Sequence, residues 1–198
     1  MTHNDHNDDY RKKSPHKLKT TFSDMMISKK MEDALNQQIA YEGYASFLYL
    51  SMATWCDHKG LQGCANFLQR QSEEERMHMM KIFQYLSDVD GFAKTPGIKE
   101  PPHEFESVQE VFKSVYAHEQ KVTQSINKLV GLANKENDYA TQTFLQWYVN
   151  EQREEEALMR TVLDRIGLIG DGPQCLYFID KEMEALNKAA VTAEGEGA

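Results

Sequence analysis

Residues 67–78 read FLQRQSEEERMH, a stretch whose apolar and polar positions recur at the spacing of an α-helix. Steps of three and four residues place four of its side chains on one helix face: Leu68, Gln71, Glu75 and His78. This face is otherwise apolar, so its polar members stand out. Glu75-Arg-Met-His78 is a Glu-x-x-His pair, which presents one oxygen and one nitrogen ligand on the same side of a helix.

Three other stretches have an apolar face at the same spacing, and each carries polar residues near its middle. The first stretch has Glu42 there, the third has Glu119, and the fourth has Gln152 and Glu155. On one helix, a single glutamate in such a face is usually a rim residue. Four helices with a central carboxylate are different, because mid-helix residues come level across a bundle whichever way each helix runs.

The connections between these helices predict the topology. Turn residues at 57–60 and 133–138 are short breaks that join antiparallel neighbours. Residues 89–106 contain two glycines and three prolines and cannot be helical, and Ser107 with Glu110 forms a capping-box signal after them. About 18 extended residues span ~60 Å, whereas a helix of about 28 residues is roughly 42 Å long. The chain is therefore predicted to be all-α, an up-down-down-up four-helix bundle with one long crossover connection.

The two ends of the chain differ from this central part. Residues 1–24 are polar and are expected to form a flexible extension, followed by a single domain over residues 25–190. A short fifth helix is expected after Gly170-Asp-Gly-Pro173, because proline suits a first helical turn and residues 176–179 are apolar. Residues 191–198 are expected to form a disordered C-terminal tail.

The polar residues of the four faces predict a metal centre. Six side chains should converge on one small volume: Glu42, Glu75, His78, Glu119, Gln152 and Glu155. A buried carboxylate without a partner costs many kcal/mol or becomes protonated. Four together call for a total cation charge of about +4, which two metal ions supply. Oxygen donors with a single imidazole favour iron or manganese over copper, and the absence of thiolate disfavours zinc.

Composition limits the classes of function. The chain has 198 residues, a net charge of −9 and a pI near 5.3, which disfavour nucleic acid and anionic membranes as ligands. No apolar run approaches the ~18 residues of a membrane span. The three cysteines are scattered, and the N-terminus has no apolar segment of a secretion signal. These features predict a cytoplasmic location.

Over residues 25–190, the sequence resembles the bacterial non-haem ferritins. Five stretches carry the resemblance: Gln38–Glu42 (QIAYE), Phe67–His78, His118–Asn127 (HEQKVTQSIN), Phe144–Glu156 (FLQWYVNEQREEE) and Leu176–Lys181 (LYFIDK). The resemblance implies the ferritin-like form of the four-helix bundle, with the short fifth helix at its C-terminal end.

The resemblance also implies roles for individual residues. A first iron site would comprise Glu42, Glu75 and His78. Glu75 would bridge to a second site, completed by Glu119, Gln152 and Glu155. A third, weaker site would comprise Glu74, Glu151, Glu154 and the shared Glu155. Tyr49 would take part in catalysis together with the six ligands of the dinuclear site, and Trp147 would be a second redox-active neighbour.

The activity that this resemblance implies is iron storage with ferroxidase activity. Fe(II) would be oxidised by O2 or H2O2 at the dinuclear site, and Fe(III) would be stored as a hydrous oxide inside a homo-oligomeric shell of twenty-four subunits. Two alternatives stay open at this stage. One is a di-iron oxidase or peroxidase of the rubrerythrin type without storage, and the other is a purely structural bundle that binds no metal.

Two departures distinguish this chain from other di-iron families. Bacterioferritins and rubrerythrins have a second Glu-x-x-His, where this chain has Gln152-Arg-Glu-Glu155. A second position without imidazole should hold iron less tightly and suits a site that passes oxidised iron onward. Bacterioferritins bind haem through a methionine directly after the bridging glutamate, where this chain has Arg76. We therefore expect no haem.

Overall fold

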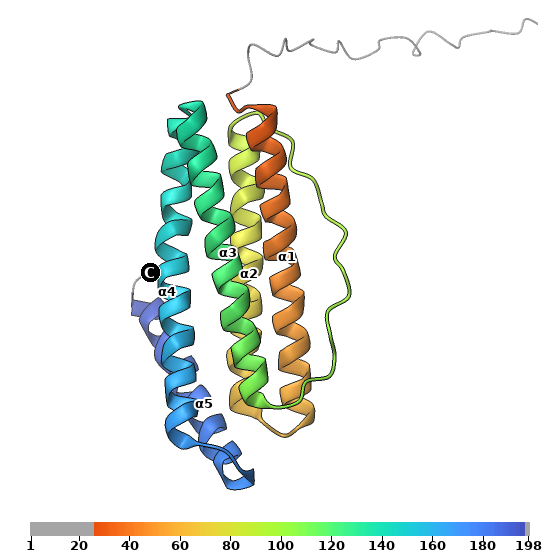
Figure 1. Cartoon of the computed structure of the whole chain (residues 1–198), viewed down its shortest axis with the longest axis vertical. Coiled ribbons are helices and arrows are strands. Elements are labelled where there is room, and N and C mark those ends of the chain that lie inside the picture. Colours follow the sequence, from red (N-terminus) through yellow and green to blue (C-terminus); the bar gives the residue numbers. More distant parts are fainter. Residues whose placement is uncertain (1–25, 197–198) are drawn as a thin grey trace, which may run out of the picture.

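The computed structural model describes residues 26–196, and every regular element in this range is an α-helix (Figure 1). The described chain contains α1 (Lys29–His58), α2 (Gln62–Asp88), α3 (Val108–Glu136), α4 (Tyr139–Ile169) and α5 (Pro173–Glu196). None of these described helices is both long and apolar enough to cross a membrane. The predicted N-terminal extension, residues 1–24, lies outside the described residues.

Side chains at the helix ends explain where the helices begin and stop. Ser28, Ser107 and Asp138 precede α1, α3 and α4, and their side-chain oxygens accept hydrogen bonds from backbone N–H groups three residues later, at 2.9–3.1 Å. Asn137 ends α3 in the left-handed conformation, with φ 56°. This single residue and Asp138 make the turn, so the break that we predicted over residues 133–138 is shorter than expected.

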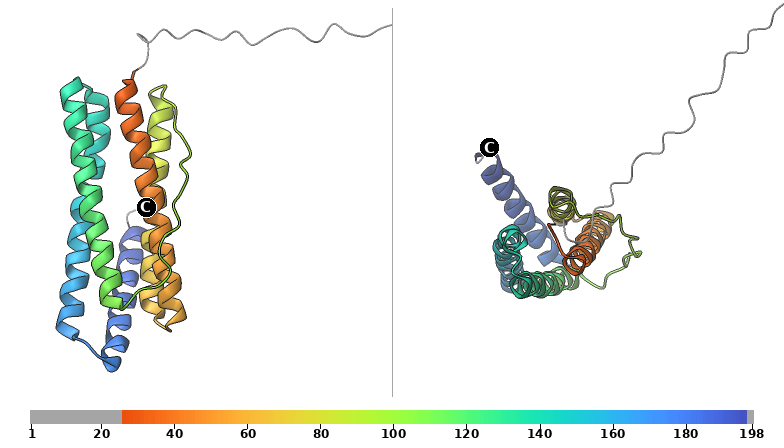
Figure 2. Two further views of the ribbon diagram at one scale, coloured as in Figure 1. Left: turned by 45° about the vertical axis from the view of Figure 1, so that its right-hand side comes forward. Right: turned by 90° about the horizontal axis from the view of Figure 1, so that it is seen from above.

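The crossover is the connection that sets the topology. It follows the length of α1 on the outside of the bundle (Figures 1 and 2) and makes α2 and α3 parallel. The buried side chain of Asn36 donates to the carbonyl of Phe92 at 2.9 Å and accepts from the backbone N–H of Lys94 at 2.6 Å. Near the other end, Ser51 donates to the carbonyl of Pro102 at 2.6 Å. These contacts fix the crossover against α1, as the predicted bundle requires.

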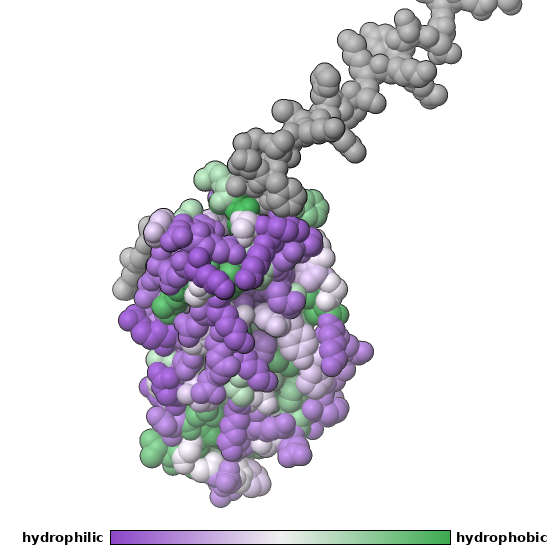
Figure 3. Space-filling model, turned by 45° about the horizontal axis from the view of Figure 1, so that its top comes forward, coloured by the Kyte–Doolittle hydropathy of each residue, from purple (hydrophilic) through white to green (hydrophobic). Residues whose placement is uncertain are grey.

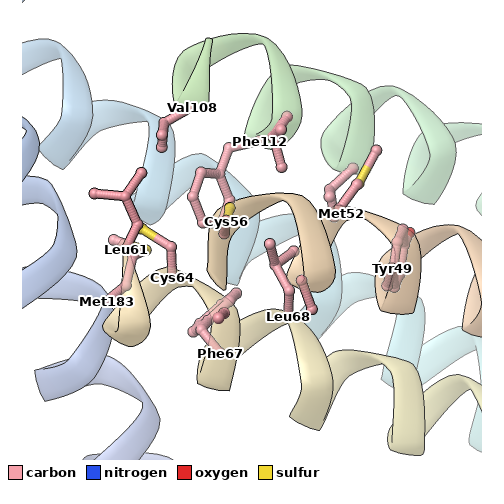
Figure 4. Close-up of a cluster of buried hydrophobic side chains, with 14 of the residues drawn as sticks. Tyr49, Met52, Cys56, Leu61, Cys64, Phe67, Leu68, Val108, Phe112 and Met183 are labelled. Atoms are coloured by element: carbon pink, nitrogen blue, oxygen red, sulfur yellow. The ribbon is translucent and has the colours of Figure 1, made fainter. Parts of the chain in front are cut away.

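The apolar core is divided into two clusters by a polar layer. One cluster surrounds Phe67 and Phe112, whose rings are 5.8 Å apart, and includes the free thiols of Cys56 and Cys64 (Figure 4). The other includes Ile39, Ile82, Val122 and Tyr148. Along each of the four bundle helices, the central polar residues lie between a residue of one cluster and a residue of the other. The outer face shown in Figure 3 is mainly hydrophilic, with scattered apolar patches.

The fifth helix is longer than we predicted. It has 24 residues and continues to Glu196, so the helix enters the segment where we expected a disordered tail from residue 191. Residues 181–194 are rich in alanine, glutamate and lysine, which favour helix, and Glu184 pairs with both Lys181 and Lys188 at 2.8 and 2.7 Å. Its start is packed closely on α2, since a Cβ at Gly63 would lie 2.0 Å from the carbonyl oxygen of Asp180.

Candidate metal centre

The structure brings the six predicted ligands together in the polar layer. They come from four helices and are at most 7% exposed: Glu42, Glu75, His78, Glu119, Gln152 and Glu155. The negative charges of Glu119, Glu42 and Glu155 all raise the pKa of Glu75, so Glu75 lies close to a carboxylate from each of the other three helices. Their convergence agrees with the prediction from the four helix faces. Their roles as ligands stay predictions.

The α1/α2 side of the layer holds three close ligand atoms. Glu42, Glu75 and His78 each offer one ligand atom, and these atoms lie within 4.8 Å of one another. Nδ1 of His78 is 3.6 Å from Oε2 of Glu75. Apart from the hydrogen bond that Glu42 and Glu75 form with each other when one of them is protonated, no partner is available to both oxygens of Glu75, both ring nitrogens of His78 and Oε2 of Glu42, all of which are buried. Buried polar atoms are normally paired, so this group fits a bound cation.

The α3/α4 side of the layer is different, because its carboxylates already accept hydrogen bonds. Tyr49 donates to Oε1 of Glu119, and Gln152 donates to Oε2 of Glu119 at 3.1 Å. Gln71 donates to Oε2 of Glu155 at 3.3 Å. Tyr49, predicted as a catalytic neighbour, therefore contacts the candidate second position directly. A cation here has to compete with hydrogen bonds that the protein itself provides.

Burial controls the protonation of the layer. It raises the pKa of Glu42 to about 7 and, together with the charge of Glu119, that of Glu155 to about 9. Burial and the neighbouring carboxylates raise the pKa of Glu75 well above its usual value. Burial lowers the pKa of His78 to about 4, so its imidazole is neutral and able to ligate. Without a cation the layer holds protons, and a bound cation would displace them.

Supporting residues that the sequence did not single out hold the first group in place. The buried side chain of Gln38 donates to Oε1 of Glu42 at 2.9 Å and accepts from the hydroxyl of Ser125 at 2.6 Å. Tyr148 donates to the backbone carbonyl of His78 at 2.6 Å. Gln38 precedes Glu42 by four residues, a spacing that could have identified it. Such outer contacts orient ligands and tune their affinity.

The predicted third group lies beside Glu155, towards the surface. The charges of Glu74 and Glu151 both raise the pKa of Glu155. Burial and, to a smaller extent, the charge of Glu154 raise the pKa of Glu151. Oε1 of Glu151 is 3.9 Å from Nε2 of His78. Glu154 is the most exposed member, with 70% of its side chain accessible. The three acids therefore form a partly exposed flank that is continuous with the buried layer.

Two further predictions concern residues around His78. The ring of Trp147 packs edge-on to the imidazole of His78, with centroids 5.3 Å apart, so Trp147 contacts a candidate ligand. Arg76, which stands where a haem-binding methionine would be, is exposed. The Glu42–Glu75–His78 group suits a hard cation, and the carboxylates of the α3/α4 side and the more open acidic flank lie next to it.

Comparisons with known proteins agree with this architecture. A family model described as a ferritin-like domain matches residues 32–169. The bacterial non-heme ferritin of Escherichia coli O6:H1 is 41% identical over 162 residues, which cover 82% of this chain and 98% of the relative. The bacterial non-heme ferritin of Campylobacter jejuni is 44% identical over 156 residues, covering 79% and 93% of the two chains.

A solved structure leads to the same assignment. The open pore ferritin from the hyperthermophilic archaeon Archaeoglobus fulgidus has 46% sequence identity and a TM-score of 0.78, over 80% of this chain and 97% of its own. The match of the family model, over residues 32–169, covers the four bundle helices except for the first three residues of α1, and it includes every residue of the polar layer. The protein is thus a member of the ferritin family.

Proposed function

We propose that this protein is an iron-storage ferroxidase, which oxidises Fe(II) in the polar layer and stores Fe(III) as a hydrous oxide. The observation that carries this proposal is the buried Glu42–Glu75–His78 group, in which three ligand atoms, one from each residue, lie within 4.8 Å of one another. Fe(II) is the substrate. Its hard character suits carboxylate oxygens and a neutral imidazole.

The six buried residues divide into two iron positions in this proposal. Glu42 and His78 hold the first iron, and Glu75 bridges it to the second. Glu119, Gln152 and Glu155 complete the second position. Binding two Fe(II) ions displaces the protons that burial places on these carboxylates, so uptake releases protons. O2 or H2O2 accepts the electrons, and the protein supplies coordination and position.

The second position releases Fe(III) after oxidation more readily than it retains iron. It has no imidazole, and its carboxylates accept hydrogen bonds from Tyr49, Gln152 and Gln71 when no cation is bound. These hydrogen bonds return as Fe(III) leaves, which lowers the free-energy cost of emptying the position. The acidic flank of Glu74, Glu151 and Glu154 provides the third iron site and the next ligands along the exit.

Storage requires an enclosed space, which one four-helix bundle does not have. We therefore infer a hollow homo-oligomer, of twenty-four subunits by analogy with the family. A cytoplasmic location fits the sequence and this role. The alternative, a di-iron oxidase or peroxidase of the rubrerythrin type, is disfavoured by Gln152, which replaces the second imidazole expected of a permanent di-iron cofactor.

One experiment tests the proposal against its alternatives. Purified protein is loaded aerobically with Fe(II), and its mass and iron content are measured by size exclusion with light scattering and metal analysis. A shell of twenty-four 22.8 kDa chains has a mass of about 550 kDa and should take up far more than two irons per chain. A small oligomer with two irons per chain would support the oxidase, and a chain without fast Fe(II) oxidation would support the structural bundle.

A further inference from the structure

A groove of about 660 Å3 lies between α1 and α3 and belongs to no part of the proposed iron site. Its lining includes Tyr41 and Tyr44 from α1 and His118, Lys121 and Lys128 from α3. A volume of several hundred cubic ångströms is typical of sites for small organic molecules. The groove is therefore large enough for a ligand with one or two aromatic rings.

The charge of the groove is opposite to that of the chain as a whole. Among the described residues, its lining contains Lys121 and Lys128 and no aspartate or glutamate, although the chain carries a net charge of −9. Neither lysine forms an ion pair with another described residue. This local excess of positive charge is complementary to a small anion.

The polar and aromatic groups of the groove suit a hydroxylated ring. Tyr41 is 44% exposed and Tyr44 is partly buried, so both offer ring surface for packing against an aromatic ligand. Nε2 of His118 is buried and has no hydrogen-bond partner.

A continuous series of rings connects the groove to the polar layer. The ring of His118 lies 6.1 Å from that of Tyr44 and 5.9 Å from that of Tyr49, measured between centroids. Tyr49 in turn donates its hydroxyl to Glu119, a candidate ligand of the second iron. The centroid separations are those of aromatic rings in contact. No other residue is needed to join the groove to the candidate iron site.

We propose that this groove binds a small anionic electron donor of the hydroquinone class, and that Tyr44 and His118 pass its electrons to Tyr49. The lysines fit the anionic substituent, and the tyrosines fit the ring. The inference rests on the proposed function, because the ferroxidase reaction supplies the oxidant.

Reduction of O2 to water takes four electrons. The two Fe(II) ions of the dinuclear site and one Fe(II) ion at the acidic flank provide three. When Tyr49 provides the fourth, its phenolic proton moves along the hydrogen bond to Glu119. One electron from the donor and the return of this proton restore Tyr49. A hydroquinone that loses two electrons and two protons becomes a quinone, so one donor molecule restores Tyr49 after two turnovers.

Binding is tested first, with 2,5-dihydroxybenzenesulfonate as the probe and iron-free protein. We expect saturable binding of one probe per chain by calorimetry. The double variant Lys121→Ala/Lys128→Ala should weaken it about five- to tenfold, since each partly screened charge contributes a modest free energy. Lys113→Ala, an exposed position on the same helix that lines no described groove, is the control and should bind as the parent does.

Electron transfer is tested by adding the same probe during aerobic Fe(II) oxidation. Quinone formed per iron oxidised is measured by absorbance and the lifetime of the tyrosyl radical by electron paramagnetic resonance. Tyr44→Phe keeps the ring but is much harder to oxidise, so quinone yield should fall severalfold and the radical on Tyr49 should persist longer. Tyr139→Phe, an exposed tyrosine at the start of α4, is the matched control.

The outcomes separate this inference from the proposed function. If the parent does not oxidise Fe(II) rapidly, the proposed function fails. If it oxidises Fe(II) rapidly but the probe does not bind, or binds with the same affinity to the double lysine variant, the groove is not the site. If binding is as expected but Tyr44→Phe gives the parental quinone yield and radical lifetime, the ring series does not carry the electrons and the inference is overturned.

Discussion

On the α1/α2 side of the polar layer, five buried ligand atoms of Glu42, Glu75 and His78 have no hydrogen-bond partner outside this group of three residues. On the α3/α4 side, the carboxylates of Glu119 and Glu155 accept hydrogen bonds from neutral donors. An unpartnered buried acceptor is costly, whereas a partnered one is satisfied without metal. The first side therefore gains more from a cation than the second. The two iron positions should differ in affinity, although both are built from buried carboxylates.

The largest expected effect comes from removing the residue that joins the two sides. Glu75→Ala deletes the shared carboxylate, so rapid Fe(II) oxidation should fall by roughly two orders of magnitude or more. Stopped-flow absorbance at two Fe(II) per chain measures it. Glu73→Ala, an exposed neighbour on the same helix, should oxidise Fe(II) at the parental rate. An unchanged fast phase in Glu75→Ala would contradict the bridging role.

A second change addresses the α1/α2 side alone. Gln38→Leu removes the donor to Glu42 and leaves Ser125 without its acceptor, so the first iron should bind about tenfold more weakly. Anaerobic Fe(II) titration resolves the tighter and the weaker position. The exposed Gln37→Leu serves as the control. A loss of affinity confined to the weaker position would mean that Gln38 supports the other side of the layer.

A third change should reduce the difference between the two sides. Gln152→His adds an imidazole to the second position, so iron retained there after mild chelation should rise and repeated Fe(II) additions should be oxidised severalfold more slowly. Gln146→His places the same residue on the exposed face of α4 and should change neither value. If retention and repeat rates in Gln152→His equal those of the parent, residue 152 does not face the second iron.

The pH dependence of stability provides a fourth test. Burial raises the pKa of Glu42 to about 7 and of Glu155 to about 9, from an ordinary value near 4.5. The folded, metal-free protein therefore holds more protons than the unfolded chain, and stability is lost as pH rises through these values. The Tm should fall by about 5 °C between pH 7 and 9.5, where His78 is already neutral.

Two controls accompany this measurement. Glu155→Gln carries no titrating carboxyl and should flatten the upper part of the curve. Anaerobic Fe(II) should remove the decline in the parent, because the cation replaces the protons. A Tm that rises with pH in the metal-free parent would show that these carboxylates are ionised in the folded state.

The smallest expected effect concerns the exposed flank. Glu151→Ala and Glu154→Ala should leave the fast step of the dinuclear site mostly intact, because these residues are more exposed than its ligands. The number of Fe(II) ions oxidised per O2 should change modestly, as measured with an oxygen electrode. The same number of Fe(II) ions oxidised per O2 in both variants and the parent would show that this flank is a solvated acidic surface without a role in oxidation.

The sequence predicts the bundle and the layer because both follow from periodicity. Four helices of about the same length, each with its central polar residues in phase, leave little choice about where those residues meet. Hydrogen bonding between the helices was not predictable in this way. Gln71 donates to Glu155, and Ser125 donates to Gln38, through particular side-chain conformations that a helical repeat does not specify. The hydrogen bonds that distinguish the two proposed iron positions are therefore visible only in the structure.

Helix ends were also less predictable than helix faces. Further steps of four and three residues from His78 lead to Ile82 and Tyr85. In the structure Leu86 is buried at this end of α2, whereas Tyr85 is partly exposed and its ring stacks on that of Phe144, with centroids 3.9 Å apart. The predicted end of α5, before residue 191, came too early, because the last turns of this helix have helix-favouring residues without a distinct apolar face. Local propensity extended this helix beyond the part that packs on α2.

The division of the core into two apolar clusters restricts how this chain can change in length. One inserted residue advances a helix by about 100°. An insertion in α1 between Glu42 and Tyr49 would rotate the residues that α1 contributes to one cluster away from the other helices, while its residues in the other cluster stayed in place. A deletion would do the same in the opposite sense. Insertions and deletions should therefore be tolerated in the crossover, and the four bundle helices should keep their length around the layer through evolution.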